Sequence, residues 1–557
     1  MRIRVLVHLS VAVLLVALMV WRPKAEQAGY GAATFCTAMP STGRRIAVSN
    51  GAELQAALDQ AVAGDTILLA AGATFRPLTG ASFVLRRRDI RGAARVTVRS
   101  ADPSFDAQGA RPPFTRVDKP DARLMPKILA ISSSPAIRTE PGARGYRLVG
   151  LEVGVDAGVP QVSNLVELGT GQESSVDAEP SDIVIDRCYL HGSDNANVRR
   201  GVAFNGVRLA VVESYLDNFH DANGDSQAIA GWNGPGPFKI VDNVLEAASE
   251  NVMFGGGDPA IPDLVPADIE IRRNLMTKRL SWRTGGVAVK NAFELKNARR
   301  VVVDGNTFEH VWPSGQDGTA IVLKSVNQDG RCAWCVTEYV TFSNNVVRDT
   351  ANGLMLNAAE TGADGAPQPK PANHIRVQNV LVTVGGADWK GGGKLLRIMG
   401  GVSDVAITHM TSLSNPGGIL DPRDAEDRNP RLTFQFNIIE RKYYGIGTGR
   451  DEGTSTLARN FAPFTYSDNI LVNTSAATDQ SIGDQALKGR YPEGTTVAPA
   501  WTALGIKDGI SQWLTGGPYS GGDSPRPGID SASLTRASHG PDSAACDGPP
   551  AHHEQHE

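Results

Sequence analysis

The sequence predicts an all-β fold, a parallel β-helix of about ten coils preceded by a capping helix. Three observations predict it: a short apolar motif that recurs along the chain, a second set of short strands between its copies, and an N-terminal segment suited to closing one end of a stack. The composition agrees, because the 557 residues include 60 glycines and only 6% aromatic residues. That balance suits many tight turns better than long packed helices.

The recurring motif consists of a few alternating apolar residues, often an Asn, and two further residues of which at least one is apolar. The marker positions, each an Asn or its equivalent, are Cys188, Ser214, Asn243, Asn274, Asn306, Asn345, Asn379, Thr411, Asn437 and Asn469. The alternation within each copy excludes helical solenoids, and most intervals are too short for a four-stranded propeller blade. We expect the Asn side chains to form a structural ladder along the stack.

A second set of strands is expected between the markers, at residues 252–255, 293–296, 321–324, 354–357 and 396–399. In one of them Phe293 and Leu295 alternate with Glu294 and Lys296. One face of this strand should therefore enter the core while the other meets solvent. These strands supply an outer wall.

A short helix is predicted ahead of the repeats. Asn50 followed by Glu53 is a helix-start signature, and Leu54 and Leu58 then fall on one helical face. Residues 64–75 follow as a first strand and turn. An amphipathic helix in this place would cover the open hydrophobic end of the stack and its unpaired strand edge.

Residues 1–28 form a signal peptide or an N-terminal membrane anchor, two alternatives that the sequence leaves open. Residues 5–21 are apolar except for His8 and Ser10 and have basic residues on both sides. Either alternative places the remaining chain outside the cytoplasm, as a secreted, periplasmic or membrane-anchored protein. The β-helix is expected over residues 46–475, and residues 476–557 should form an irregular extension with a polar tail.

Charge and cysteine content limit the partners and the covalent bonds. Lys and Arg total 55 against 59 Asp and Glu, so no basic excess attracts nucleic acid. Five cysteines are too few to hold an exported chain of this length together. Cys332 and Cys335 form either a loop-closing disulfide or a pair of loop thiols, and Cys188 should be buried. We expect a monomer.

The segment Asn-Gly-Ala-Glu-Leu-Gln-Ala-Ala-Leu at residues 50–58, followed by Gly-Asp-Thr-Ile-Leu-Leu at 64–69, resembles the N-terminal cap of the pectin-lyase-like, right-handed parallel β-helix superfamily. With the downstream coils the similarity covers roughly residues 46–475. Blocks between residues 220 and 330 also resemble exported bacterial β-helix proteins without an assigned activity. The resemblance implies the fold but no single reaction, because the superfamily includes lyases, hydrolases, epimerases, tailspikes and adhesins.

Two activities of this superfamily are disfavoured by the residues present. Its polysaccharide hydrolases carry clustered aspartates, because inversion at a sugar needs a carboxylic acid and a carboxylate around a water. This chain has no Asp-Asp pair and no Gly-His-Gly segment. The pectate-lyase pattern Arg-x-Pro-x-x-Arg occurs at residues 111–116, ahead of the clear repeats, whereas that family carries it on later coils. We interpret it as a chance match.

The resemblance to other β-helix lyases implies a simpler arrangement. A basic side chain removes the C5 proton of a uronic acid while an Arg or a metal neutralises the carboxylate. Lys296 and Lys324 are the candidate bases, because the expected register places them on adjacent coils with backbones about 4.8 Å apart. Arg273 and Arg283 complete the predicted catalytic set. The alternative is a solvated charged face with ordinary ion pairs.

Substrate-binding residues and a metal site are predicted around this pair. The substrate-binding set is Glu294, Asn357, Arg397, Trp232 and Trp282. Indole rings in loops stack on sugars, or else they pack against the coil wall. The predicted calcium ligands are Asp221, Asn223, Asp225 and Glu250. The first three present oxygens at alternate positions, as calcium loops do, and a plain polar turn is the alternative. No other cofactor is expected.

These observations lead to a hypothesis for function. The chain is expected to bind an extended, anionic polysaccharide along the outer wall of the β-helix and to cleave it by β-elimination. The alternative is a non-catalytic cell-surface binding or adhesion protein that uses the same wall. The identity of the polymer does not follow from the sequence.

Overall fold

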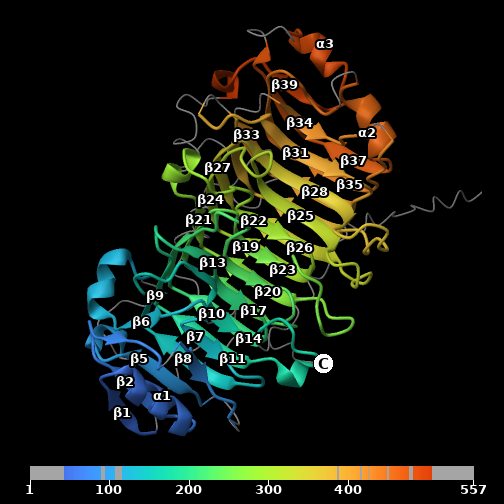
Figure 1. Ribbon diagram of the computed structural model, residues 1–557. Helices are drawn as coiled ribbons and strands as arrows, with labels where there is room; N and C mark the ends of the chain where they lie inside the picture. The colour runs from blue at the N-terminus through green and yellow to red at the C-terminus, as the bar shows by residue number, and fades with distance from the viewer. Residues whose placement is uncertain are drawn as a thin grey trace, which may run out of the picture.

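The computed structural model describes residues 43–504 apart from residue 79 and residues 89–93, 107–115, 386–387, 414–416, 425, 448–450 and 476–480. The predicted signal peptide or anchor, residues 111–115 of the Arg-x-Pro-x-x-Arg pattern and residues 505–557 of the predicted extension lie outside the described residues. The described chain winds into a right-handed parallel β-helix of about 13 coils with few helices (Figure 1), which confirms the predicted fold.

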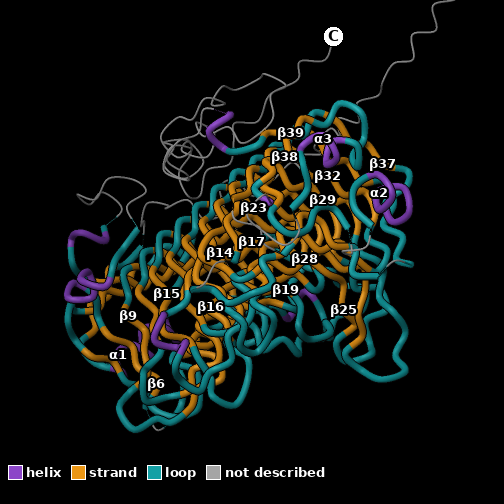
Figure 2. The backbone as a smooth tube through the Cα atoms, turned by 90° about the horizontal axis from the view of Figure 1, so that it is seen from above, coloured by secondary structure: helices purple, strands orange, loops and turns teal. Residues whose placement is uncertain are grey.

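Within the described residues, three parallel sheets of 14, 14 and 11 strands run along the stack (Figures 1 and 2). Sheet A contains β1 (Arg45–Val48), β2 (Thr66–Leu69), β5 (Val96–Ser100), β8 (Arg144–Val149), β11 (Ser181–Asp186), β14 (Val207–Val212), β17 (Phe238–Val241), β20 (Ala267–Arg272), β23 (Ala298–Asp304), β26 (Thr337–Ser343), β29 (Asn373–Gln378), β32 (Ser403–Thr408), β35 (Leu432–Gln435) and β37 (Phe464–Ser467). Sheet B contains β3 (Thr74–Phe75), β6 (Lys127–Ala130), β9 (Glu152–Val155), β12 (Tyr189–His191), β15 (Tyr215–Phe219), β18 (Val244–Ala247), β21 (Leu275–Thr277), β24 (Thr307–Val311), β27 (Val346–Thr350), β30 (Leu381–Val384), β33 (Thr411–Leu413), β36 (Ile438–Arg441), β38 (Ile470–Asn473) and β39 (Thr496–Ala498). Sheet C contains β4 (Phe83–Leu85), β7 (Ile137–Thr139), β10 (Gln161–Leu168), β13 (Asn197–Phe204), β16 (Gln227–Gly231), β19 (Glu250–Phe254), β22 (Phe293–Leu295), β25 (Thr319–Asn327), β28 (Asn352–Thr361), β31 (Lys394–Met399) and β34 (Gly418–Asp421).

The core fills the space between the three sheets. Phe293 and Leu295 of β22 are both fully buried in it, as their alternation with charged residues predicts. The parallel register places Phe293 beside Val252 of β19 and Ile321 of β25. Apolar columns of this kind continue from coil to coil, and burial of such side chains from water is the main favourable term in folding.

The corner between sheets A and B repeats one backbone conformation. The residue just before each ladder position has a positive φ, for example 54° at Arg273. The Asn that follows is bonded to the next coil: the backbone N–H and Nδ2 of Asn243 each donate to Asn274 Oδ1 at 2.9 Å. The same bonds continue through Asn306 to Asn345. The predicted Asn ladder is therefore present and structural.

Two markers lie one residue away from the ladder. The strand register pairs Leu381 with Thr411. The ladder positions of these two coils are therefore Val380 and Met410, and the ladder is interrupted there. Asn379 occupies the preceding corner position with a φ of 53°, a conformation that Asn adopts more readily than most residues. An Asn near this corner can therefore either form the ladder hydrogen bonds or adopt the positive φ of the preceding position. The sequence pattern did not distinguish these two roles.

The coils number about 13 rather than the predicted ten. The strands β2, β5 and β8 belong to coils that precede the first marker, Cys188. No Asn follows these three strands at the corner, so the marker pattern missed their coils.

Both ends of the stack carry additional elements. The helix α1 (Gly51–Gln60) lies at the N-terminal end of the stack (Figure 1). Asn50 Oδ1 accepts a hydrogen bond of 3.0 Å from the Glu53 backbone, and Leu54 and Leu58 are buried, as predicted. The helices α2 (Thr454–Asn460) and α3 (Asp484–Lys488) lie near the other end. Short 3₁₀ turns include η4 (Leu280–Arg283). No helix in the described part of the chain is long and apolar enough to span a membrane.

The cysteines in the described residues follow the first of the predicted alternatives. Cys332 and Cys335 form a disulfide, and Cys188 is a buried free thiol. The disulfide closes the loop between β25 and β26. It is a local staple and not a bond between distant parts of the fold.

Candidate functional site

Lys296 and Lys324 lie side by side on the outer face of sheet C. Strand pairing places Leu295 of β22 opposite Leu323 of β25, and each lysine follows its leucine directly. Because both leucines are buried in the core, the next side chain on each strand faces outward. The structure thus has the register on which the sequence hypothesis depends.

Glu294 lies between the side-chain nitrogens of Lys296 and Lys324. Its Oε1 is 3.4 Å from Lys324 Nζ, and its Oε2 is 3.8 Å from Lys296 Nζ. Asn291 Nδ2 donates a hydrogen bond of 3.1 Å to the same carboxylate. Glu294 faces away from the core as predicted, yet its side chain is only 1% exposed, so this carboxylate is shielded from solvent.

Lys324 is held by a second carboxylate. Its Nζ donates a hydrogen bond of 2.8 Å to Glu360 Oε2, and Asn357 Nδ2 donates to Glu360 Oε1 at 2.6 Å. Burial alone would lower the pKa of Lys324, but the carboxylates of Glu294 and Glu360 outweigh burial and raise this pKa above its usual value. Lys324 therefore remains an ammonium ion at neutral pH.

Glu250 is a second buried carboxylate in the same wall. It is fully buried on β19, and Gln227 Nε2 donates a hydrogen bond of 2.7 Å to its Oε2. Burial first, and then the negative charges of Glu294 and Asp225, raise the pKa of Glu250 to about 7. This carboxyl group therefore titrates near neutrality.

We call Lys296, Lys324, Glu294, Asn291 and Glu250 the lysine cluster. Three buried oxygen atoms in it accept no hydrogen bond from the described residues. They are Glu250 Oε1, Asn291 Oδ1 and Glu294 Oε1; the last makes only the long ion pair with Lys324. Buried polar oxygens are rarely left in this condition, because each loses its hydration without replacement. Carboxylate and amide oxygens are the ligand types that Ca²⁺ prefers, so the chemistry of these three residues is compatible with a calcium ion.

Lys278 is a buried lysine that holds the backbone of Asn291. It is completely buried, and its Nζ is hydrogen-bonded to the backbone oxygens of Ala247, Ser249 and Asn291 at 2.7–3.1 Å and to Asn251 Oδ1 at 3.1 Å. Burial lowers the pKa of Lys278 to about 7, against the attraction of nearby glutamates. Because all its bonds are internal, Lys278 positions Asn291 and does not face a ligand.

The predicted calcium ligands do not converge. Asp221 Oδ1 accepts a hydrogen bond of 2.9 Å from the Asn223 backbone, which makes a local turn, and the Asn223 side chain is exposed. Asp225 Oδ2 is paired with Lys290 Nζ at 2.5 Å. Of the four, Glu250 belongs to the lysine cluster, and Asp225 is close enough to raise the pKa of Glu250. Residues 221–223 form the polar turn that was the alternative to a calcium loop.

The predicted arginines lie apart from the two lysines. Arg273 is the corner residue between sheets A and B, where its positive φ serves the turn. Arg397 pairs with Asp317 at 2.9 Å and lies in the column of Glu294, three coils further along sheet C. Arg283 lies in the loop that leads into β22. Neither Arg273 nor Arg397 is therefore placed to neutralise a charge beside Lys296.

The predicted aromatic residues lie at opposite ends of the sheet C strands: Trp232 follows β16, and Trp282 precedes β22. Trp232 directly follows Gly231 of β16, and its ring lies 5.0 Å from the guanidinium carbon of Arg200. Its Nε1 donates to Gly171 O at 3.3 Å. Trp232 is thus at the edge of sheet C, two coils before Lys296. Trp282 belongs to η4 beside Arg283.

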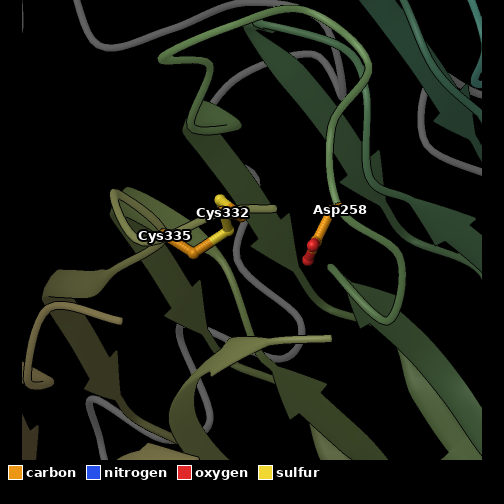
Figure 3. Close-up of side chains that lie close together, drawn as sticks. All are labelled: Asp258, Cys332 and Cys335. Carbon is orange, nitrogen blue, oxygen red and sulfur yellow. A yellow bond between two sulfur atoms is a disulfide. The ribbon is translucent and has the colours of Figure 1, made fainter. Parts of the chain in front are cut away.

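A second group with metal-ligand chemistry lies where the loop after β19 meets the loop after β25. The side chains of Asp258, Cys332 and Cys335 bring their ligand atoms within 4.8 Å of one another (Figure 3). The two sulfurs are bonded to each other. The Asp258 carboxylate accepts backbone hydrogen bonds of 2.8–3.0 Å from the loop 328–331. This group orders a loop and, while the disulfide is intact, offers no thiolate to a metal.

Sequence reasoning missed Asn291, Lys278, Lys290 and Glu360. A signal existed for Asn291, because it precedes Glu294 by three residues and the register that aligns Val252 with Phe293 also brings it beside Glu250. The other three come from loops and strand ends of unequal length, for which the repeat gives no register.

Comparisons with known proteins bear on the fold. The chain resembles the PL6-family alginate lyase AlyGC with a TM-score of 0.50 at 12% sequence identity, over 82% of this chain and 53% of that one. A mannuronic-acid-specific polysaccharide family 6 lyase from human gut microbiota gives 0.49 at 10% identity, over 83% and 93%. The tailspike protein of E. coli bacteriophage HK620, in complex with a pentasaccharide, gives 0.41 at 11%, over 78% and 64%. At these identities the likeness concerns the fold alone. No protein-family model and no curated protein matches the sequence.

Proposed function

We propose that this protein binds an acidic polysaccharide along the outer face of sheet C and cleaves it by β-elimination. The observation that carries the proposal is the pair Lys296 and Lys324 around the shielded carboxylate of Glu294. Nearby, Glu250 Oε1 and Asn291 Oδ1 are buried and accept no hydrogen bond from the described residues. A solved structure with the same fold that is named a PL6-family alginate lyase supports the substrate class. A location outside the cytoplasm is part of the proposal.

The two lysines are suited to different steps. Among the described residues, Lys296 has one long carboxylate contact, at 3.8 Å, and in its neutral amine form it takes the role of base. It accepts the C5 proton of a uronic acid, the electron pair of that C–H bond forms the C4–C5 double bond, and the C4–O bond breaks. Lys324, kept protonated by Glu294 and Glu360, supplies positive charge to the substrate carboxylate and a proton to the departing oxygen.

A calcium ion belongs to the same proposal. Glu250, Asn291 and Glu294 would hold it through the oxygens that lack donors. When bound, Ca²⁺ stabilises the negative charge that develops on the uronate as the proton leaves. It would also neutralise Glu294 and so weaken the hold of this carboxylate on Lys296. Because Glu250 has a raised pKa, protons compete with the ion, and affinity for Ca²⁺ should increase with pH between about 6 and 8.

The proposal is tested by incubating the purified protein with alginates, pectates and glycosaminoglycans, with Ca²⁺ or with a chelator. β-Elimination creates an unsaturated uronate, which absorbs in the near ultraviolet, so product formation is followed directly. We expect an increase with at least one polyuronate, and a slower one with the chelator. No increase with any polyanion in either condition would refute the lyase proposal.

A second candidate function is non-catalytic binding at the cell surface. It is favoured by the ion pairs that already engage both lysines, because a charged wall of paired groups needs no reaction to explain it. Retained binding of a polyanion without any unsaturated product would select this function.

A further inference from the structure

Aromatic rings gather in the loops that connect sheet B to sheet C. His220 stands before β16, Trp282 before β22, Trp312 before β25 and Trp389 before β31. The rings of His220 and Trp282 are 5.9 Å apart. Since strands of neighbouring coils lie about 4.8 Å apart, these loops place rings along one edge of sheet C. The chemistry proposed for Lys296 uses none of them.

Arg283 is held between two of these rings. Its guanidinium carbon lies 5.7 Å from the ring centre of Trp312 and 4.9 Å from that of Trp389. It also donates a hydrogen bond to the backbone oxygen of Asp388. Contacts of a cation with indole faces fix the planar group in place. Arg283 is thus an ordered cation, although its side chain is exposed.

No carboxylate among the described residues lies within 4.0 Å of the Arg283 guanidinium. The contrast with Arg279, four residues earlier, is direct: Arg279 pairs with Asp194 at 2.9 Å and with Glu246 at 3.0 Å. A guanidinium has five N–H donors, and one hydrogen bond to the described chain accounts for a single donor of Arg283. The remaining donors are available to an anion.

A hollow of about 300 Å³ opens beside this arginine. It is lined by Trp282, Arg283, Trp312 and Pro313, together with Gly285 and Gly286. A Cβ atom at either glycine would meet nothing within 4 Å, so this side of the hollow is open. The volume is at the lower end of the range for small-ligand sites. The walls combine the partly exposed indole of Trp282 with the Arg283 guanidinium, which has no carboxylate partner among the described residues.

We propose that this hollow binds one pyranose ring that carries a carboxylate. The C–H face of the sugar packs on indole, and the carboxylate pairs with the planar fork of Arg283 in a bidentate manner. The choice of a uronate rests on the proposed function, but the site is separate from the lysine cluster. It extends polymer binding from the outer face of sheet C onto the loops at its edge.

Binding, and not cleavage, is the suitable measurement. Titration calorimetry and tryptophan fluorescence with alginate oligosaccharides of one defined length would compare the parent with Arg283→Gln and Trp389→Ala. Arg431→Gln is the matched control, since Arg431 is an exposed arginine that pairs with Asp404 on sheet A. We expect Kd to increase about tenfold or more for Arg283→Gln, a smaller increase for Trp389→Ala, and no change for the control. Dextran should not bind.

The outcomes separate the two proposals. Elimination with an unchanged Kd in Arg283→Gln and Trp389→Ala would refute uronate binding in the hollow and would leave the proposed function intact. Binding that depends on Arg283 without elimination would support the hollow and refute the lyase. Tighter binding of a sulfated glycan than of any polyuronate would overturn the carboxylate assignment. A parent protein that binds no polyanion contradicts both.

Discussion

The Asn ladder and the lysine cluster both bury polar side chains on the same β-helix, but they differ in how those groups are satisfied. In the ladder, Asn306 Oδ1 accepts two hydrogen bonds from Asn274, and its Nδ2 donates to Ile271 O at 2.9 Å. In the cluster, Glu250, Asn291 and Glu294 each retain a buried oxygen that accepts no hydrogen bond from the described residues. The polar side chains that form the corners of the coils thus have their hydrogen bonds made. Groups left incomplete at a free-energy cost are candidates for ligand binding.

The largest stability effect is expected in the ladder. Asn306→Ala would leave the Asn274 backbone N–H buried without an acceptor and remove the donor to Ile271. We expect the free energy of unfolding to fall by roughly 2–4 kcal/mol, as measured by chemical denaturation. Asn223→Ala, at an exposed turn, should change it by less than about 0.5 kcal/mol. Equal effects of the two substitutions would remove the distinction between a satisfied ladder and an ordinary surface Asn.

We expect Ca²⁺ to stabilise the protein by binding the lysine cluster and not the turn at residues 221–223. A ligand that binds only the folded state at 100 times its Kd adds about 2.7 kcal/mol of stability. Thermal unfolding with and without Ca²⁺ should therefore show an increase in Tm for the parent and none for Asn291→Ala. Asp221→Asn should respond as the parent does, because Asp221 is engaged in its own turn. Loss of the response in Asp221→Asn alone would restore the calcium site that the sequence predicted.

A smaller effect is expected from the charge of Glu250. The folded-state pKa of about 7 is above the ordinary value of 4.5, so the folded protein binds this proton more tightly than the unfolded chain. Stability from this group is present at pH 4.5 and is lost as pH rises towards 7. Glu250→Gln keeps the shape and removes the titration. In a chelator, we expect the variant to match the parent at pH 5 and to exceed it by roughly 1–3 kcal/mol at pH 7.5. A constant difference at both pH values would show that Glu250 is ionised throughout.

The sequence predicted features that depend on strand alternation. Phe293 and Leu295 define which face of β22 enters the core, and that face determines the register of Lys296 with Lys324. The capping helix was equally accessible, because Asn50 and Glu53 form a local hydrogen-bonded start. In each case the local structure is determined by residues only a few positions apart in the sequence.

The remaining features depend on loops whose lengths differ from coil to coil. Arg273 is near Lys296 in sequence, yet it occupies the corner between sheets A and B. Glu360, at the far end of β28, was not expected near Lys324 and pairs with it at 2.8 Å. Positions in loops and at strand ends have no periodic pattern that would place them, so these partners required coordinates.

The central claim is that Lys296 removes a proton from a uronic acid on the outer face of sheet C. The most direct measurement is the initial rate of unsaturated-uronate formation by the parent, by Lys296→Ala and by Lys370→Ala, an exposed lysine elsewhere on the surface. Loss of a positioned base should slow Lys296→Ala about 10²–10⁴-fold and leave Lys370→Ala unchanged. A folded Lys296→Ala variant that forms product at the rate of the parent would contradict the account.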